Sequence, residues 1–332
     1  MSELRYNVIC HEWVVIASER AKRPQEFSSK QPWSHGGEEY SSTCPFCPGN
    51  DRPDEVITLS MPAEGLWQTR VVLNKYPALS PNGHYGSMDV GFQRSVGGFG
   101  THEVIVENRH HGKTMATMSK EELQLILETY RFRYRKLRMD NRLRSIVIFK
   151  NHGPEAGTSL IHPHSQIVAT PIVPNRTRSR LEESARFFDA TGQCLFCRTV
   201  DEELADGRRI LIENEHFVAF VPYAALSPFH IWIFPKRHEA SFGDVELSEL
   251  PSLAQTLRDV MRRIDLGLGD PSFNLTILSI PLNARDKSAF HWYVSIVPRV
   301  SKIAGFELGC GMHINPAIPE ESAKFLQSVS ID

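Results

Sequence analysis

Two Cys-x-x-Cys pairs, each followed by two histidines, constrain the fold of this chain more than any other feature. The residues are, in order, Cys44, Cys47, His111 and His162 in the first set and Cys194, Cys197, His238 and His291 in the second. The histidines of each set are separated by similar intervals, which contain apolar residues at helical spacing and then an apolar strand. Self-similarity of this kind predicts a duplicated domain.

Each set supplies two thiolates and two imidazoles, which together fill the four positions of a tetrahedral zinc site. Because no position is left open, we predict two structural Zn²⁺ sites. A redox role for Cys44 and Cys47 is disfavoured by the prolines around them, since a redox pair opens a helix. His110 is an alternative ligand in the first set, and His216 and His230 are alternatives in the second. Unliganded thiols and surface histidines are the remaining interpretation.

The segment Ser159–Gln166 is the strongest candidate for a chemical site. It follows an apolar strand, residues 144–149, and a turn-rich stretch, residues 151–157. If the chain re-enters the sheet near Ile161, the alternation of a strand places His162, His164 and Gln166 on one face. A row of polar side chains on one strand face is unfavourable in an ordinary core and therefore indicates a site.

The motif His162-Pro-His164-Ser-Gln166 resembles the active-site motif of the galactose-1-phosphate uridylyltransferase family, a branch of the histidine-triad superfamily. The resemblance implies that His164 is the nucleophile that accepts a nucleoside monophosphate as a phosphoramidate. It also implies that Ser159, Gln166 and Asn151 hold phosphate oxygens. In the second repeat, Tyr293 occupies the position of the nucleophile, so we expect chemistry in the first half alone.

The fold implied by the resemblance is α+β, with two tandem histidine-triad-like domains. Each domain would be a mainly antiparallel sheet with a packed helix. We place the N-terminal domain, which carries the nucleophile motif, at residues 1–190. The C-terminal domain, residues 191–332, would carry the degenerate motif and a segment that binds the sugar.

Further site residues are carried over from the same resemblance. They are Arg20 and Arg23 for substrate phosphates, Asn74 and Lys75 for the nucleoside pocket, and Lys302, Phe306 and Glu307 for the hexose. The family usually has Asp at the position of Lys75. The stretch Gly305-Phe-Glu-Leu-Gly309 and the second Cys-x-x-Cys are more similar to the ADP-glucose phosphorylase-like branch, so the identity of the base stays open.

The predicted function is exchange of a nucleoside monophosphate between an NDP-sugar and a hexose 1-phosphate, of the UDP-glucose–hexose-1-phosphate uridylyltransferase type. One alternative is an ADP-glucose phosphorylase-like adenylyltransferase, with phosphate as a possible acceptor. Another is a nucleotide hydrolase of the histidine-triad type. Gln166 disfavours the hydrolase, because hydrolytic relatives generally have a third histidine at that position.

Composition argues against a nucleic-acid-binding zinc module. The 332 residues carry 37 basic and 39 acidic side chains, a formal net charge of −2, and no basic stripe with interleaved aromatic residues. No apolar run approaches membrane-spanning length. We therefore expect a cytoplasmic protein that binds neither nucleic acid nor membranes. Separately, we expect a homodimer.

Overall fold

The structure is a computed structural model that describes residues 2–18, 27, 38–52, 54–158 and 160–331. A 10-stranded sheet runs through both halves of the chain, and every neighbouring pair of strands in it is antiparallel. Its order from edge to edge is β10 (Ile210–Glu213), β11 (Phe217–Phe220), β12 (Ile231–Pro235), β14 (Tyr293–Pro298), β13 (Phe273–Leu278), β8 (Ser145–His152), β9 (His164–Thr170), β7 (Thr101–Val106), β4 (Thr69–Leu73) and β3 (Ile57–Met61).

The strand order is symmetric about the pair β8 and β13. On either side of this pair lies the strand that follows a predicted metal-ligand histidine, β9 in the first half and β14 in the second. Outside these strands lie β7 and β12, which are again equivalent by position. The duplication predicted from the sequence is therefore visible in the topology, and the two copies meet edge to edge in one sheet.

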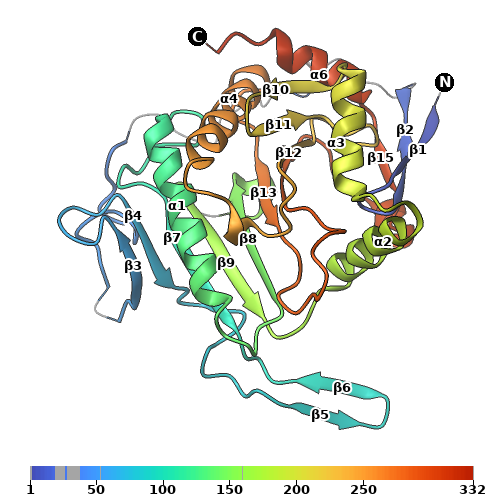
Figure 1. The fold of residues 1–332 in the computed structure, drawn as a ribbon. Coiled ribbons are helices and arrows are strands. Elements are labelled where there is room, and N and C mark those ends of the chain that lie inside the picture. Colours follow the sequence, from blue (N-terminus) through green and yellow to red (C-terminus); the bar gives the residue numbers. More distant parts are fainter. Residues whose placement is uncertain (1, 19–26, 28–37, 53, 159, 332) are drawn as a thin grey trace.

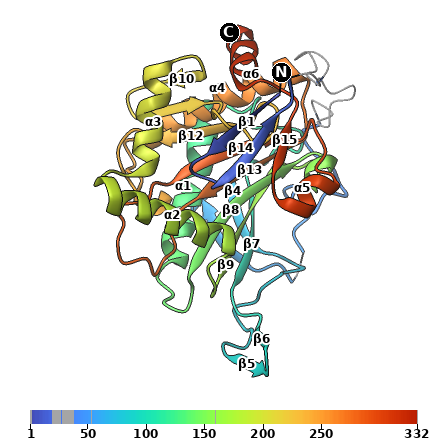
Figure 2. The same ribbon diagram turned by 90° about the vertical axis from the view of Figure 1, so that its right-hand side faces the viewer.

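The other described strands form two smaller sheets. One contains β1 (Glu3–Asn7), β2 (Glu12–Ile16) and β15 (His313–Asn315), with β2 and β15 parallel. The other is the hairpin of β5 (Ser87–Val90) and β6 (Gln93–Val96), which projects away from the body of the molecule in both views (Figures 1 and 2).

The helices lie on both faces of the large sheet. They are α1 (Lys120–Leu137), α2 (Asn175–Thr191), α3 (Leu195–Asp206), α4 (Leu250–Leu268), α5 (Gly305–Cys310) and α6 (Pro319–Ser328), with 3₁₀ turns at Pro154–Ala156 and Phe242–Asp244. Helix α1 begins at the predicted capping box, in which the Ser119 hydroxyl accepts from the Glu122 backbone N–H and the Glu122 carboxylate accepts from the Ser119 N–H. Helices α1 and α4 pack side by side, as expected for the equivalent helices of a repeat.

The main hydrophobic core lies between the large sheet and helices α1 and α4. It is continuous across the two halves, since it contains Ile126 of α1, Ile167 of β9, Val260 of α4 and Val294 of β14. A second cluster of buried side chains lies on the opposite face of the second half, where Phe196 of α3 packs on β12 and β14. The predicted α+β class, with antiparallel strands and packed helices, is confirmed.

The domain boundary at residues 190 and 191 stays a prediction, because one sheet and one core join the two halves. Among the described residues, no helix is both long and apolar enough to span a membrane.

The core packing of α1 can be tested with two substitutions on the same helix. Ile126 is fully buried, whereas the side chain of Phe132 is 51% exposed. We expect Ile126→Ala to lower the free energy of unfolding by about 2–5 kcal/mol, because it leaves a cavity in the shared core. Phe132→Ala should change it by no more than about 0.5 kcal/mol. Urea unfolding followed by circular dichroism measures both, and equal losses would contradict the assigned packing.

Candidate nucleotidyl-transfer site and metal centres

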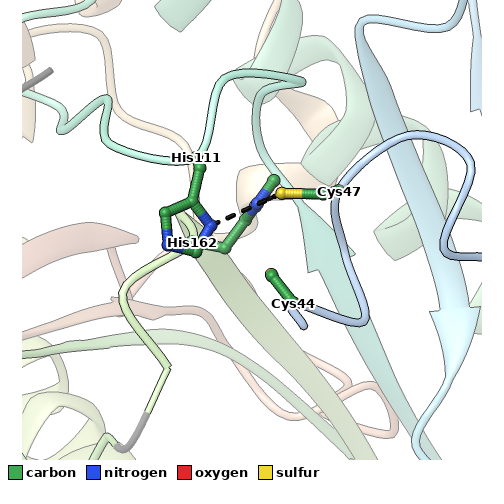
Figure 3. A group of neighbouring side chains, drawn as sticks. All are labelled: Cys44, Cys47, His111 and His162. Carbon is green, nitrogen blue, oxygen red and sulfur yellow. Dashed lines mark hydrogen bonds between the residues drawn. The ribbon is translucent and has the colours of Figure 1, made fainter. Parts of the chain in front are cut away.

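The first metal-ligand set comes together from four distant segments. The Sγ and imidazole N atoms of Cys44, Cys47, His111 and His162 all lie within 4.8 Å of one another (Figure 3). The Cys47 Sγ is 3.5 Å from the Nδ1 of His111 and 3.5 Å from the Nδ1 of His162. Ligands at usual zinc distances in a tetrahedron are about 3.3–3.8 Å apart. The donor set and its spacing therefore fit a tetrahedral ion such as Zn²⁺.

His162 is held in the orientation that a metal ligand requires. Its Nε2–H donates to the Asn108 carbonyl at 2.8 Å, which leaves the Nδ1 lone pair directed at Cys47. Burial lowers the pKa of His162 to about 4, so the ring is in the neutral form that binds metals. Burial also raises the pKa of Cys44 to about 11, so binding of a metal to its thiolate would release a proton.

In the second set, three of the four predicted ligands form a compact group. Donor atoms of Cys194, Cys197 and His238 lie within 4.8 Å of one another, and the Cys197 Sγ is 3.2 Å from the His238 Nδ1. His291 is not part of this group. However, its ring stacks on His238 with centroids 5.5 Å apart, and its Nε2–H donates to the Arg237 carbonyl at 2.9 Å. Its Nδ1 is buried and has no hydrogen-bond partner among the described residues.

The alternative ligands fall outside both groups. The His230 Nε2 is 2.8 Å from the Ser295 hydroxyl, and neither His110 nor His216 belongs to a cluster of potential ligands in the described part of the chain. Groups of cysteine and histidine that could hold a metal ion are therefore present in each half.

The candidate nucleophile, His164, begins β9 two residues after His162, the last member of the first candidate metal group. Its Nδ1–H donates to the His162 carbonyl at 2.8 Å, so the lone pair is on Nε2. Burial lowers the pKa of His164, and the nearby charge of Lys150 lowers it further. The neutral imidazole that a nucleophile needs is thus the stable form at neutral pH. Phe46, between the two cysteines of the first set, packs against the rings of both His162 and His164.

Gln166 lies on the same face of β9 as His164, as the strand alternation predicted. The intervening residue, Ser165, points to the helix side, where its hydroxyl meets Tyr130 of α1 at 2.5 Å. His162 precedes the strand and is not part of its regular alternation. The Gln166 Oε1 is 2.7 Å from the Nε2 of His102, a residue of β7 that the sequence reasoning did not single out.

Lys150 and Glu107 form a buried ion pair beneath β9, which the sequence did not predict. The Lys150 Nζ is 2.6 Å from the Glu107 carboxylate and donates to the His164 carbonyl at 3.1 Å. Tyr130 and Ser165 donate to the same carboxylate. Burial alone would raise the pKa of Glu107, but the Lys150 charge and the hydrogen bonds from Lys150, Ser165 and Tyr130 hold it below its usual value. The only indication in the sequence is that Lys150 and Glu107 each directly follow a run of apolar strand residues.

The predicted substrate residues are only partly assembled. Asn74 lies near the Gln166 side chain, because its Nδ2 is 3.1 Å from His102 Nε2. The Lys75 ammonium lies over the Tyr76 ring, 5.6 Å from its centroid. Asn151 of β8 accepts a hydrogen bond from Asn274 of β13 at 2.9 Å. Arg20, Arg23 and Ser159 lie outside the described residues.

The three candidate hexose contacts, Lys302, Phe306 and Glu307, lie on or next to helix α5. Lys302 precedes α5, and Phe306 and Glu307 are part of it, next to β15 of the small sheet. Lys302 and Phe306 are exposed. Glu307 is half-buried, and its carboxylate accepts a hydrogen bond from the Ala304 N–H at 3.0 Å. Within the described part of the chain, no hydrogen bond or ion pair connects them to His164 or Gln166.

Comparison with known proteins agrees with this geometry. The family model described as "Galactose-1-phosphate uridyl transferase, N-terminal domain" matches residues 1–174, and that for the C-terminal domain of the same family matches residues 180–330. The chain belongs to the galactose-1-phosphate uridyl transferase family. It is therefore a nucleotidyltransferase, as the motif around His164 predicted.

Individual relatives have two different names. ADP-glucose phosphorylase from Arabidopsis thaliana is 34% identical over 99% of this chain and 93% of its own length. Galactose-1-phosphate uridylyltransferase from Thermotoga maritima is 29% identical over the whole of both chains. Among solved structures, that of an ADP-glucose phosphorylase from Arabidopsis thaliana with bound ADP-glucose has a TM-score of 0.85, 31% identity and complete coverage of both chains. A uridylyltransferase structure has a TM-score of 0.76 at 26% identity, covering 99% of this chain and 98% of its own.

The buried ion pair beneath β9 leads to a stability prediction. Glu107→Gln leaves the Lys150 ammonium buried without a counter-charge, so we expect the free energy of unfolding at pH 7 to fall by about 3–5 kcal/mol. Because the folded-state pKa of Glu107 is lowered, its stabilisation is present above the unfolded pKa of about 4.3 and is lost as the pH falls through the folded value. The difference between wild type and variant should therefore narrow below about pH 4.

Urea unfolding at several pH values measures this effect. Glu213→Gln is the matched control, because its partner Lys236 is exposed and such pairs contribute at most about 1 kcal/mol. If both variants lost the same stability at pH 7, the role assigned to the buried pair would be wrong.

Proposed function

We propose that this chain transfers a nucleoside monophosphate from an NDP-sugar to a phosphate-bearing acceptor through His164. The observation that carries the proposal is the orientation of the His164 ring, whose Nδ1–H is bound to the His162 carbonyl and whose Nε2 lone pair is available. The Nε2 attacks the α-phosphorus and forms an N–P bond while the bond to the bridging oxygen breaks. Hexose 1-phosphate leaves with that electron pair.

In the second step, a phosphate oxygen of the acceptor attacks the same phosphorus and breaks the N–P bond. The imidazole of His164 recovers its lone pair, so the enzyme is regenerated. Gln166 offers amide hydrogens to the non-bridging oxygens but no titratable proton for activating water. We therefore propose transfer in preference to hydrolysis.

ADP-glucose is the donor that we favour, with phosphate as the acceptor. The relative named ADP-glucose phosphorylase is more similar to this chain than the Thermotoga uridylyltransferase, at 34% against 29% identity, and the solved ADP-glucose complex matches at a higher TM-score than the uridylyltransferase. Exchange between UDP-glucose and a hexose 1-phosphate, which the motif alone favoured, is the second candidate. It is supported by the full-length similarity to the Thermotoga protein.

The substrate-binding assignments remain part of the proposal. Asn74 and Lys75 would face the nucleoside, and Asn151, Ser159, Arg20 and Arg23 would bind phosphates. Lys302, Phe306 and Glu307 lie on or beside the exposed helix α5 and have no polar contact with His164 in the described part of their own chain. In the homodimer that we propose, these residues would contact the hexose bound in the active site of the second copy.

We propose that both metal sites hold structural Zn²⁺. The first has four suitably spaced donors. In the second, His291 is the proposed fourth ligand, because its Nδ1 is buried without a partner and its Nε2–H is bound to a carbonyl, as in His162. A bound ion would hold the segment before β9 in place and thereby position His164. Sites with two thiolates each suit a reducing compartment, which supports the proposed cytoplasmic location.

The nucleotidyl intermediate can be detected directly. We expect brief incubation with α-³²P-labelled ADP-glucose to leave one nucleotidyl group per chain, with less label from UDP-glucose. The label should be lost in acid, because a phosphoramidate is labile there. His164→Gly should abolish labelling and keep the metal content and circular dichroism of the wild type. Tyr293→Phe, at the equivalent position of the second half, should keep the label.

Several results would overturn this assignment. Labelling of the His164→Gly protein would place the nucleophile elsewhere, and loss of label in Tyr293→Phe would place it in the second half. Stronger labelling by UDP-glucose would select the uridylyl-type exchange. Release of free nucleoside monophosphate as the main product, with acceptor in excess, would favour the hydrolase.

The metal proposal is tested by elemental analysis of protein purified without chelators. We expect two zinc ions per chain. Cys44→Ser should lose one of them and unfold at a lower temperature, because metal binding contributes to the free energy of folding. Cys310→Ser is the control, since this exposed cysteine lies outside both ligand groups. Wild-type protein without zinc would refute the proposal, and one zinc ion that survives Cys44→Ser would restrict it to the second site.

A further inference from the structure

A histidine on the neighbouring strand contacts the amide of Gln166. His102 of β7 is buried, and its Nε2 is 2.7 Å from the Gln166 Oε1. It lies on an interior strand of the sheet, where β7 pairs with β9, and it is not a member of either candidate metal group. Neither the motif around His164 nor the proposed chemistry assigns it a role.

The surroundings of His102 determine which of its ring nitrogens carries the proton. The backbone N–H of Ala78 is 3.0 Å from Nδ1, and a backbone N–H can only donate. Nδ1 is therefore an acceptor, and the proton of the neutral ring is on Nε2. The Asn74 Oδ1 accepts a hydrogen bond from the Tyr76 N–H, which determines the orientation of the Asn74 amide. The Asn74 atom near His102 Nε2 is therefore the amide nitrogen, which cannot accept a hydrogen bond. The Nε2–H consequently donates to the Gln166 oxygen.

This donation determines the orientation of the Gln166 amide. An amide has an accepting oxygen at one end and a donating NH₂ group at the other, and the two ends are similar in shape. With Oε1 bound to His102, the NH₂ group points away from β7. No hydrogen bond to this NH₂ group occurs among the described residues, so its two hydrogens are available on the face of β9 that carries His164.

The second half of the chain contains the same histidine contact at the equivalent position. In the first half, Val104 is opposite Gln166, and His102 is two residues before Val104. In the second half, Trp232 is opposite Ser295, and His230 is two residues before Trp232. The His230 Nε2 is 2.8 Å from the Ser295 hydroxyl. A histidine at this position thus contacts the fourth residue after His162 in one copy and after His291 in the other.

The two copies differ in what the histidine can control. The Ser295 hydroxyl rotates and can either donate or accept, so its contact with His230 does not select one orientation. The Gln166 amide has two chemically different ends, and a turned amide would direct its oxygen at the oxygens of a bound phosphate. The contact with His102 excludes that arrangement. Only the half with the nucleophile combines this histidine with an amide.

We propose that His102 is a positioning residue that holds the NH₂ group of Gln166 toward the phosphate transferred by His164. This inference rests on the nucleotidyl transfer proposed above. Donors aimed at the non-bridging oxygens stabilise the charge that develops as the α-phosphorus is attacked, and they are most effective when they need not reorient. His102 would accordingly affect the rate of transfer more than the binding of the NDP-sugar.

A double-mutant cycle at His102 and Gln166 tests the inference. The rate of single-turnover labelling by α-³²P-labelled ADP-glucose is measured for the wild type, His102→Leu, Gln166→Ala and the double variant, with UDP-glucose in parallel. We expect His102→Leu to slow labelling about 10- to 100-fold, with little change in the concentration of donor that gives half the maximal rate. In the Gln166→Ala background, the same substitution should have almost no further effect, because His102 acts through that amide.

Two further variants separate positioning from a structural role. His102→Gln can still donate to the Gln166 oxygen, so it should recover most of the rate lost in His102→Leu. His230→Leu removes the equivalent contact of the second half and should label at the wild-type rate per folded chain. Zinc content and circular dichroism establish the folded fraction of each variant.

The outcomes distinguish this inference from the proposed function. If wild-type protein takes no label from either donor, the proposed function fails and the role of His102 fails with it. If wild type is labelled but the effects of His102→Leu and Gln166→Ala multiply independently, His102 does not act through Gln166. Equal slowing in His102→Leu and His102→Gln would also overturn the inference.

Discussion

The alternation of side chains along β9 is the constraint on which the site depends. This strand lies between β7 and β8 in an antiparallel sheet, so its register is determined on both edges. His164 and Gln166 consequently share one face, while Ser165 points to the opposite, helix side and contacts Tyr130. A slip of one residue would exchange the two faces and place an imidazole in the apolar core. The proposed chemistry therefore depends on the same pairing that stabilises the sheet.

The charged network beneath β9 connects this register to folding. Lys150 of β8 and Glu107, directly after β7, meet under the strand between them, and Lys150 also donates to the His164 carbonyl. Burying an ion pair has a desolvation cost that can exceed its Coulomb attraction unless further hydrogen bonds are present, and Tyr130 and Ser165 supply such bonds to Glu107. The pair nevertheless links three strands at the position of the nucleophile. The segment with the first candidate metal group also contacts the nucleophile, because Phe46, between Cys44 and Cys47, packs against the His164 ring.

The two repeats differ in what covers the equivalent face of the sheet. In the second half, Tyr293 occupies the place of His164 and packs with Phe196, Trp232 and Phe234 in an aromatic cluster. In the first half, His164 and Gln166 occupy this face, and Phe46 packs against the His164 ring. The same strand topology thus supports an aromatic cluster in one copy and a pair of polar side chains in the other.

The sequence by itself determined the duplication, the two groups of cysteine and histidine that could hold a metal, apart from the placement of His291, and the common face of His164 and Gln166. These features follow from spacing and from the period of a strand, which are local properties of the chain. The sequence did not reveal that both copies share one sheet, or that Lys150 meets Glu107 and His102 meets Gln166. Each of these pairs joins residues on different strands, and only the tertiary register brings them within hydrogen-bonding distance. A buried lysine or histidine has no distinctive local pattern, because its role depends on the partner that the fold places beside it.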